Sequence, residues 1–444
     1  PSGVWQTLKR PGESETVQLK YIIGSGSHAF GYLAQIGNHL FQSPIAYYTA
    51  RHAWGMAPGY EGTTRPNFSR PVSLECLTCH SGRPRAVPNT LNSYLDPPIA
   101  EEGIQCERCH GDASRHLKNP VPGSILNPAT LPVAARDSIC EQCHLAGEVR
   151  VPNPGRNISD FRPGEPLEDV YSTYVFRRSP QASIKVISQS EELAMSACAR
   201  NSGGRLWCGT CHNPHETPAH PAAYFRKRCL TCHAATLSAA HAAPGRNCIA
   251  CHMPRRPASN GSHTAFTDHR ISRRPGVSAS TGAAPPVLIA WRKPAPALRD
   301  RNLAIALVTA GLENRVPGQV IRGYRMLTAI EGSLSNDASA LTVLGTVLLK
   351  GKQPLAAQRR FARALKLRPN YAPYEVNMAV ALADTGHTDQ AVQHLERAVR
   401  LDPLLQQAVD LLSSLYRLQG QPEKAGAIMA RYRAAMGINL QEAK

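Results

Sequence analysis

Twelve of the thirteen cysteines fall in six copies of one pattern, Cys-x-x-Cys-His. In chain order the copies place these residues: Cys76, Cys79 and His80; Cys106, Cys109 and His110; Cys140, Cys143 and His144; Cys208, Cys211 and His212; Cys229, Cys232 and His233; Cys248, Cys251 and His252. This pattern is the attachment site of a c-type haem, in which two thiols form thioethers with the vinyl groups and the adjacent imidazole binds the iron. The sequence therefore predicts six covalently bound haems and their iron.

Paired cysteines have two other common uses in proteins, zinc binding and disulfide formation. Six Cys-x-x-Cys pairs could build three zinc ribbons with four thiolates each, or form disulfides in an oxidising compartment. Neither use requires a histidine after the second cysteine. With 17 histidines in 444 residues, a histidine follows all six pairs by chance on the order of once in a few hundred million. Cys198 has no partner at this spacing, so we predict a packed free thiol, with a reactive or regulatory thiol as the alternative.

The remaining histidines are candidates for the second axial position of each iron. Nine lie in the cysteine-bearing part of the chain: His28, His39, His52, His116, His215, His220, His241, His263 and His269. His215 follows His212 by three residues, and His116 follows His110 by six. Such short segments cannot pass around a macrocycle to the other face of the same haem. We therefore expect each of these two histidines to bind a neighbouring haem and to hold adjacent haems close together.

The charge of the chain agrees with a cofactor that carries negative groups. Residues 1–300 contain 32 basic and 21 acidic side chains, an excess of eleven positive charges. Ionised haem propionates offset part of this excess. The basic residues are scattered and form no basic helix, so we expect no nucleic-acid partner. No apolar run is long enough to span a membrane.

Three regions must position these residues. Residues 1–270 are expected to form the haem domain, mostly irregular and α-helical with a few short strands, because Pro and Gly clusters separate the motifs. Residues 271–300 are rich in Ser, Ala and Pro, which predicts an extended linker. Residues 301–444 change to a helical pattern that repeats every 34 residues, the tetratricopeptide period. An all-α solenoid of such repeats, with an irregular helix pair at about 301–333, is expected there, and we expect it to be separable from the haems.

Several segments together resemble a known family. They are residues 21–28, 56–60, 75–80, 103–111, 162–165, 208–215 and 267–269. This series resembles the bacterial multihaem c-type cytochromes fused to tetratricopeptide repeats, whose haem domain is similar to the tetrahaem cytochrome associated with hydroxylamine oxidoreductase. The resemblance implies that the distal ligands are His28, His116, His215, His241, His263 and His269. Members of that family often carry a further motif upstream of the segment that resembles residues 1–30, and the resemblance leaves open a larger precursor or a reduced variant.

Three functions follow as hypotheses. The first is electron transfer through the six haems between redox partner proteins, with no substrate of its own. The alternative is a redox enzyme that acts on a small nitrogen compound at a five-coordinate haem. The third is an assembly, a homo-oligomer or filament, in which the repeat domain makes protein–protein contacts. Haem attachment takes place outside the cytoplasm, so we expect an exported protein, periplasmic or at the cell surface.

Overall fold

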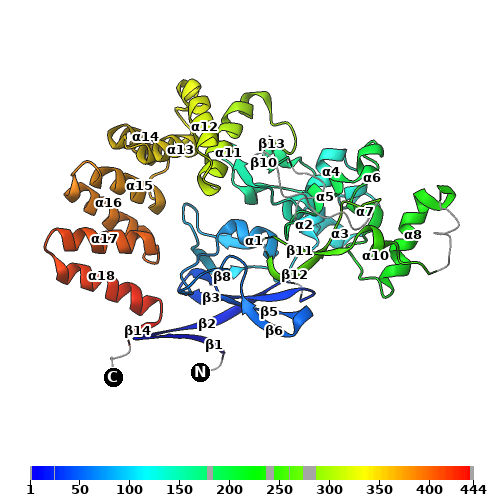
Figure 1. Cartoon of the computed structure of the whole chain (residues 1–444), viewed down its shortest axis with the longest axis horizontal. Coiled ribbons are helices and arrows are strands. Elements are labelled where there is room, and N and C mark those ends of the chain that lie inside the picture. Colours follow the sequence, from blue (N-terminus) through cyan, green and yellow to red (C-terminus); the bar gives the residue numbers. More distant parts are fainter. Residues whose placement is uncertain are drawn as a thin grey trace. The chain divides into compact units, whose positions relative to one another are not determined.

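The computed structural model describes residues 3–24, 26–177, 184–236, 245–259, 261–273 and 287–440. The chain divides into two compact units, which are described separately (Figure 1). Unit 1 comprises residues 1–104, 151–159 and 294–444, and unit 2 comprises residues 105–150 and 160–293. This division differs from the predicted boundaries, because the N-terminal strands share a core with the repeats. None of the described helices combines the length and apolar character that a membrane span requires.

Unit 1 begins with an antiparallel sheet of seven strands, larger than the few short strands expected from the sequence. Its strands are β1 Val4–Arg10, β2 Glu13–Ile23, β3 Ala29–Ile36, β4 His39–Gln42, β5 Ile45–Tyr48, β6 Ala53–Met56 and β14 Ile438–Leu440. The helix α1 (Leu74–His80) and the strand pair β7 (Pro84–Ala86) and β8 (Tyr94–Ile99) follow the sheet. Leu77 of α1 is buried with Leu33, Leu40 and Tyr94, which fixes the first cysteine motif against the sheet.

The second part of unit 1 is a series of helix hairpins (Figure 1). The helices are α11 Arg299–Glu313, α12 Pro317–Ala329, α13 Ala338–Lys350, α14 Pro354–Leu367, α15 Ala372–Ala383, α16 Thr388–Leu401, α17 Gln406–Leu418 and α18 Pro422–Ala435. Helices α13, α15 and α17 begin 34 residues apart, as do α14, α16 and α18. Small residues lie where paired helices touch: a Cβ on Gly345 would come within 2.4 Å of the Phe361 ring. The predicted tetratricopeptide repeats are confirmed.

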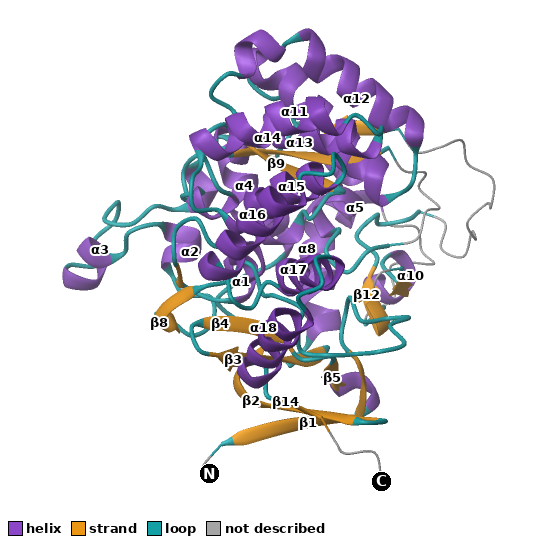
Figure 2. Ribbon diagram, turned by 90° about the vertical axis from the view of Figure 1, so that its left-hand side faces the viewer, coloured by secondary structure: helices purple, strands orange, loops and turns teal. Residues whose placement is uncertain are grey.

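The last repeat and the N-terminal sheet share one apolar core. Its buried residues are Val17, Ala34, Phe41 and Phe68 from the N-terminal part and Leu404, Val409, Tyr432 and Met436 from the repeats. Strand β14 then pairs with β2, so the end of the solenoid joins the sheet (Figure 2). Gly437 has φ +67°, and any Cβ there would lie 2.3 Å from the Thr16 carbonyl oxygen. The all-α prediction for residues 301–444 is therefore wrong at β14, and the repeats share a core with the sheet.

Polar contacts reinforce the same junction. Glu15 is fully buried, and its carboxylate accepts hydrogen bonds from the Phe68 N–H at 3.2 Å and from Arg10 at 3.2 Å. Burial raises the pKa of Glu15, although these two hydrogen bonds oppose the rise. His39 Nε2 lies 3.0 Å from the Ser93 hydroxyl and 3.3 Å from the Asp402 carboxylate. His39 and Asp402 thus pair the sheet with the repeats, and Glu15 is paired within the N-terminal part.

Unit 2 contains short helices and small sheets. Its helices are α2 Glu107–His110, α3 Ser114–Lys118, α4 Val133–His144, α5 Gln189–Met195, α6 Ala197–Asn201, α7 Cys208–Cys211, α8 Pro221–His233 and α10 Cys248–His252. Its strands are β10 Tyr171–Phe176, β11 Arg255–Ala258, β12 Gly261–Thr267 and β13 Leu288–Ala290, and β9 (Val149–Pro152) also pairs with β10. No residue of α7, α8 or α10 is buried. The irregular and helical character predicted for this stretch matches the structure.

The described end of the predicted linker belongs to unit 2 up to residue 293 and to unit 1 from residue 294. Strand β13 pairs with β10, and Leu288 is buried. Trp291 Nε1 donates to Glu141 at 3.1 Å, and Arg292 forms an ion pair with the same carboxylate at 2.5 Å. Helix α11 begins at Arg299, inside the predicted linker. Residues 287–300 are therefore packed structure, and the part of the linker at 274–286 lies outside the described residues.

The shared core predicts that Tyr432→Ala weakens the sheet as well as the last repeat. Tyr432 and Tyr374 are both 6% exposed, but the described apolar cluster that contains Tyr374 consists of repeat residues. Removing a buried aromatic side chain costs about 3 kcal/mol. Hydrogen exchange should speed up in β1, β2 and β3 in Tyr432→Ala, whereas Tyr374→Ala should affect α13 to α15. Equal protection of the sheet in both variants would contradict a shared core.

Candidate functional site

Every cysteine motif lies on a helical turn. The first, third and fifth copies end the helices α1, α4 and α8, the second and sixth form α2 and α10, and the fourth forms α7 with His212 as its C-cap. An α-helix has about 3.6 residues per turn, so residues i, i+3 and i+4 project from the same side. Each turn thus presents two thiols and one imidazole together. All thirteen cysteines are free thiols in the structure, Cys198 included.

The thiols of successive motifs in unit 2 are neighbours. Cys140 and Cys208 form a hydrogen bond, which raises the pKa of Cys140, as burial also does, and lowers the pKa of Cys208. Burial raises the pKa of Cys229 to about 11, and a hydrogen bond to Cys248 adds to the rise. The structure therefore brings the third motif beside the fourth and the fifth beside the sixth.

Cys198 belongs to the same group of thiols. It lies on α6 and interacts electrostatically with Cys211 and Cys229, one cysteine of the fourth motif and one of the fifth. The sequence predicted a packed free thiol, and the structure shows a half-buried free thiol among motif cysteines. Sequence spacing gave no sign of this neighbourhood, because the contacts join separate helices.

Two predicted proximal histidines lie near predicted distal histidines. The ring centroids of His110 and His215 lie 5.8 Å apart with planes inclined at 19°. Those of His212 and His269 lie 6.3 Å apart with planes inclined at 29°. Two imidazoles bound through nitrogen to one metal ion at about 2 Å each have centroids roughly 6 Å apart. Both pairs therefore have the spacing that bis-histidine coordination requires, and His215 lies beside a motif other than its own.

Several of the predicted ligand imidazoles share a hydrogen bond at Nδ1, which leaves Nε2 available to a metal. In six of the predicted ligands Nδ1 lies within hydrogen-bond distance of an oxygen: His110 at 2.7 Å from Leu126 O, His116 at 2.8 Å from Ser124 Oγ, His144 at 3.3 Å from Gln189 Oε1, His215 at 3.2 Å from Asn213 Oδ1, His252 at 2.8 Å from Ser272 O, and His269 at 2.9 Å from Thr267 O. When Nδ1 donates to oxygen, Nε2 keeps its lone pair for a metal. Burial lowers the pKa of His212 and of His269, which favours the neutral, metal-binding form.

The other candidates are spread over the structure. His39 uses Nε2 to bond Ser93 and Asp402 in unit 1, so that nitrogen serves the fold. His28, His52 and His80 also lie in unit 1, and His220 and His233 mark the two ends of α8 in unit 2. The predicted ligand His241 falls outside the described residues. His263 lies in strand β12.

Carboxylates that the sequence analysis missed hold His269 in place. Glu192 Oε2 accepts a hydrogen bond from the backbone N–H of His269 at 2.9 Å. Asp268 is 3% exposed and pairs with Arg270 at 2.6 Å and with Arg256 at 3.0 Å. The Thr-Asp-His segment marks Asp268 in the sequence, but nothing in the sequence points to Glu192, which is far away in the chain. These contacts fix the backbone on both sides of the imidazole.

No family model matches the chain. It is 32% identical over 117 residues to the TPR repeat-containing thioredoxin TTL4 of Arabidopsis thaliana, which covers 26% of this chain and 17% of that protein. Among solved structures, MamA matches with a TM-score of 0.28 and 19% identity, over 31% of this chain and 82% of MamA. A mutant O-GlcNAc transferase of Thermobaculum terrenum matches with a TM-score of 0.28 and 21% identity, over 31% of this chain and 26% of that one. None of these three names refers to haem.

Acid should weaken the ion pairs of Asp268, which hold the backbone next to His269, and so lower the stability of the fold. Burial alone would raise the pKa of Asp268, but hydrogen bonds to Arg270 and the charges of Arg270 and Arg256 bring it below its ordinary value. A carboxyl with a lowered folded pKa contributes stability above its unfolded pKa of about 4 and loses it as the pH falls through the folded value.

The urea midpoint of unfolding at pH 6 and pH 3 tests this expectation. It should fall between the two pH values in the unmodified protein. Asp268→Asn should unfold at lower urea already at pH 6, because Arg270 loses its charged partner in a buried place, and it should change less with pH. An equal change with pH in both proteins would exclude Asp268 as the group responsible.

Proposed function

We propose that this protein is a multihaem electron-transfer protein that holds six c-type haems. The observation that carries the proposal is the pairing of imidazoles at metal-binding separation, His110 with His215 and His212 with His269, beside thiols spaced for haem attachment. Bound haem would supply iron that changes between the ferric and ferrous states. The protein would act by holding these groups close together, without a substrate of its own.

The roles of the side chains follow from their place in each motif. The two cysteines of a motif would form thioethers, and the histidine of the same motif would be the proximal ligand. His215 would be the distal ligand at the second motif and His269 at the fourth. His28, His116, His241 and His263 remain proposed distal ligands on the resemblance to multihaem cytochromes.

Zinc and disulfide chemistry fit the same cysteines less well. A zinc ribbon needs four thiolates around one ion. In the part of the chain that the structure describes, no three Cys, His, Asp or Glu side chains form such a group, and the cysteines are free thiols. The helical turns instead present each motif as a unit of two thiols and an imidazole.

The setting of the protein is part of the proposal. Enzymes that attach haem to thiols act on the outer side of the cytoplasmic membrane, so the protein would be exported to the periplasm or the cell surface. The tetratricopeptide repeats would contact other proteins, either redox partners or further copies in an oligomer or filament. No nucleic acid is expected among the partners.

Composition gives the most direct test. The intact mass of protein matured with the haem-attachment machinery should exceed the polypeptide mass by six haems, and acid acetone should not extract them because thioethers are covalent. Protein made without that machinery should lack haem. Three zinc ions per chain in place of haem would exclude the proposal.

The ligand pairs predict the spectroscopic effect of single substitutions. Two imidazoles keep haem iron low-spin and leave no open site. Electron paramagnetic resonance of the oxidised protein should show low-spin haems, and His215→Ala and His269→Ala should each convert one haem to a high-spin form that binds carbon monoxide. His387→Ala, in the repeats, is the control and should change nothing.

A native high-spin haem would instead favour the enzyme alternative, with that iron as the site for a small nitrogen compound. Conversion of the fourth-motif haem by His215→Ala would contradict the pairing of His215 with His110. A double variant with Cys106 and Cys109 replaced by Ser identifies the haem of the second motif by its absence.

A further inference from the structure

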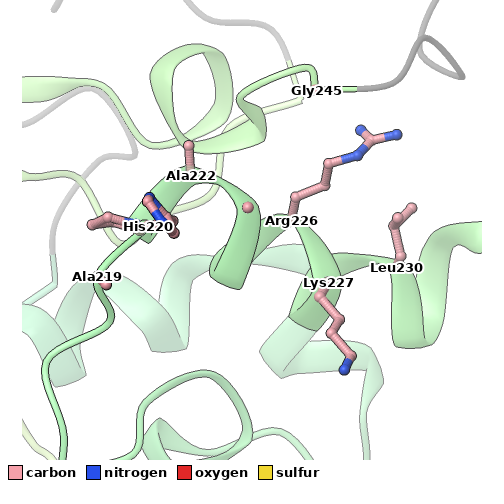
Figure 3. Close-up of a pocket in the computed structure, with 9 residues that line it drawn as sticks. Ala219, His220, Ala222, Arg226, Lys227, Leu230 and Gly245 are labelled. Carbon is pink, nitrogen blue, oxygen red and sulfur yellow. The ribbon is translucent and has the colours of Figure 1, made fainter.

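Helix α8 carries the fifth cysteine motif at its end, yet none of its thirteen residues is buried. One side of the helix lines an open hollow of about 740 Å³ (Figure 3). The lining residues are Ala219, His220, Pro221, Ala222, Ala223, Arg226, Lys227, Leu230 and Gly245. Most of the lining side chains are thus small and apolar, and Arg226, Lys227 and His220 add two cations and an imidazole. This surface had no role in the haem sites described above.

The segment that carries the hollow is basic, although Glu216 comes just before it and interacts with Arg228. Residues 217–259 contain six Lys and Arg and neither Asp nor Glu. Among the residues that the structure describes, Arg226 and Lys227 make no ion pair. Arg228 leans on the ring of Tyr224, with its guanidinium carbon 5.1 Å from the ring centre, and its side chain donates to the Tyr224 hydroxyl at 3.1 Å. The unpaired positive charge on α8 is therefore that of Arg226 and Lys227 among the described residues.

The hollow and the haem motif occupy different sides of the helix. Successive residues of an α-helix turn by about 100°, so the strip through Ala223, Arg226 and Leu230 is centred roughly 100° from that through Cys229, Cys232 and His233. On the motif side, Cys229 contacts Cys248 of α10. Arg226 lies about 67° from the centre of the motif strip and is thus presented beside the fifth motif, whereas Lys227 lies about 167° from that centre, on the opposite side of the helix. A group that docks on the hollow side would come close to the edge of that site.

We propose that the hollow side of α8 is the docking surface for an acidic redox protein that exchanges electrons at the fifth motif. The inference rests on the proposed function. Opposite charge attracts such a partner over long range and speeds its association, and salt screens the attraction. The helix is about 20 Å long, which suits a protein surface, and its floor of small apolar residues allows close approach.

Stopped-flow reduction of the full-length, haem-loaded protein tests the docking surface. The probe is flavodoxin hydroquinone, a small acidic flavoprotein; each encounter passes one electron to one ferric haem, and the flavin becomes a semiquinone. The second-order rate constant should fall as ionic strength rises. The double variant Arg226→Glu with Lys227→Glu should be about tenfold slower at low ionic strength and depend less on salt.

The matched control is the double variant Arg359→Glu with Lys366→Glu, which changes two exposed cations on α14 in unit 1 by the same total charge. Its rate constant should stay within about twofold of the unmodified protein. An equal loss in both variants would show that net charge alone matters and would overturn the proposal. No loss in the α8 variant would overturn it as well.

Two further measurements separate this proposal from the proposed function. At high ionic strength, where salt screens the charges of this anionic reductant, dithionite, which needs no docking, should reduce all three proteins at the same rate. A protein without haem, or haems that dithionite does not reduce, would refute the proposed function itself. A shifted midpoint potential with an unchanged salt dependence in the α8 variant would assign Arg226 and Lys227 to haem propionates and would refute the docking surface.

Discussion

One turn of helix is the constraint on which the arrangement of the candidate site depends. Two thiols at i and i+3 and an imidazole at i+4 share a side only while that turn is helical, and all six motifs of this chain adopt it. The motif therefore needs little support from the rest of the fold. In unit 2 it stands on helices as short as the four residues of α2 and α7. What the rest of the fold must supply is the position of one turn relative to the next.

The two units hold their motifs by different means. In unit 1, α1 is fixed by Leu77, which is fully buried against the sheet. In unit 2, the helices α7, α8 and α10 bury no residue, and their neighbours are thiols and imidazoles of other motifs. Helices this short and exposed are marginal in isolation. The apolar faces of the proposed haems would supply the buried surface that the side chains of these helices do not provide. Cofactor binding would then be coupled to folding.

Features with a fixed period could be predicted from the sequence, and features that depend on contacts between distant segments could not. The 34-residue period located the helix pairs, because each pair buries the same small positions, such as Gly345 and Ala379. Strand β14 could not be predicted: three residues after the last helix become a strand only because β2 offers its free edge. The linker prediction was wrong at its described end for the same reason, since Trp291 and Arg292 are ordered by Glu141, about 150 residues earlier in the chain.

The histidines show which features of the site could be predicted from sequence spacing and which depend on contacts between distant segments. The spacing of His215 from His212 excluded coordination of one haem by both, and the structure places His215 beside His110, far away in the sequence. The spacing could not predict which motif lies beside His215, because this neighbour depends on how α2 and the segment after α7 fold together. His39 shows the converse case: the sequence counts it with the candidate ligands, but contacts with Ser93 and Asp402 occupy its Nε2. A histidine becomes available to a metal when its Nδ1, and not its Nε2, is bonded by the fold, and that choice is made by oxygen atoms such as those of Leu126 and Thr267, whose residue types carry no signal.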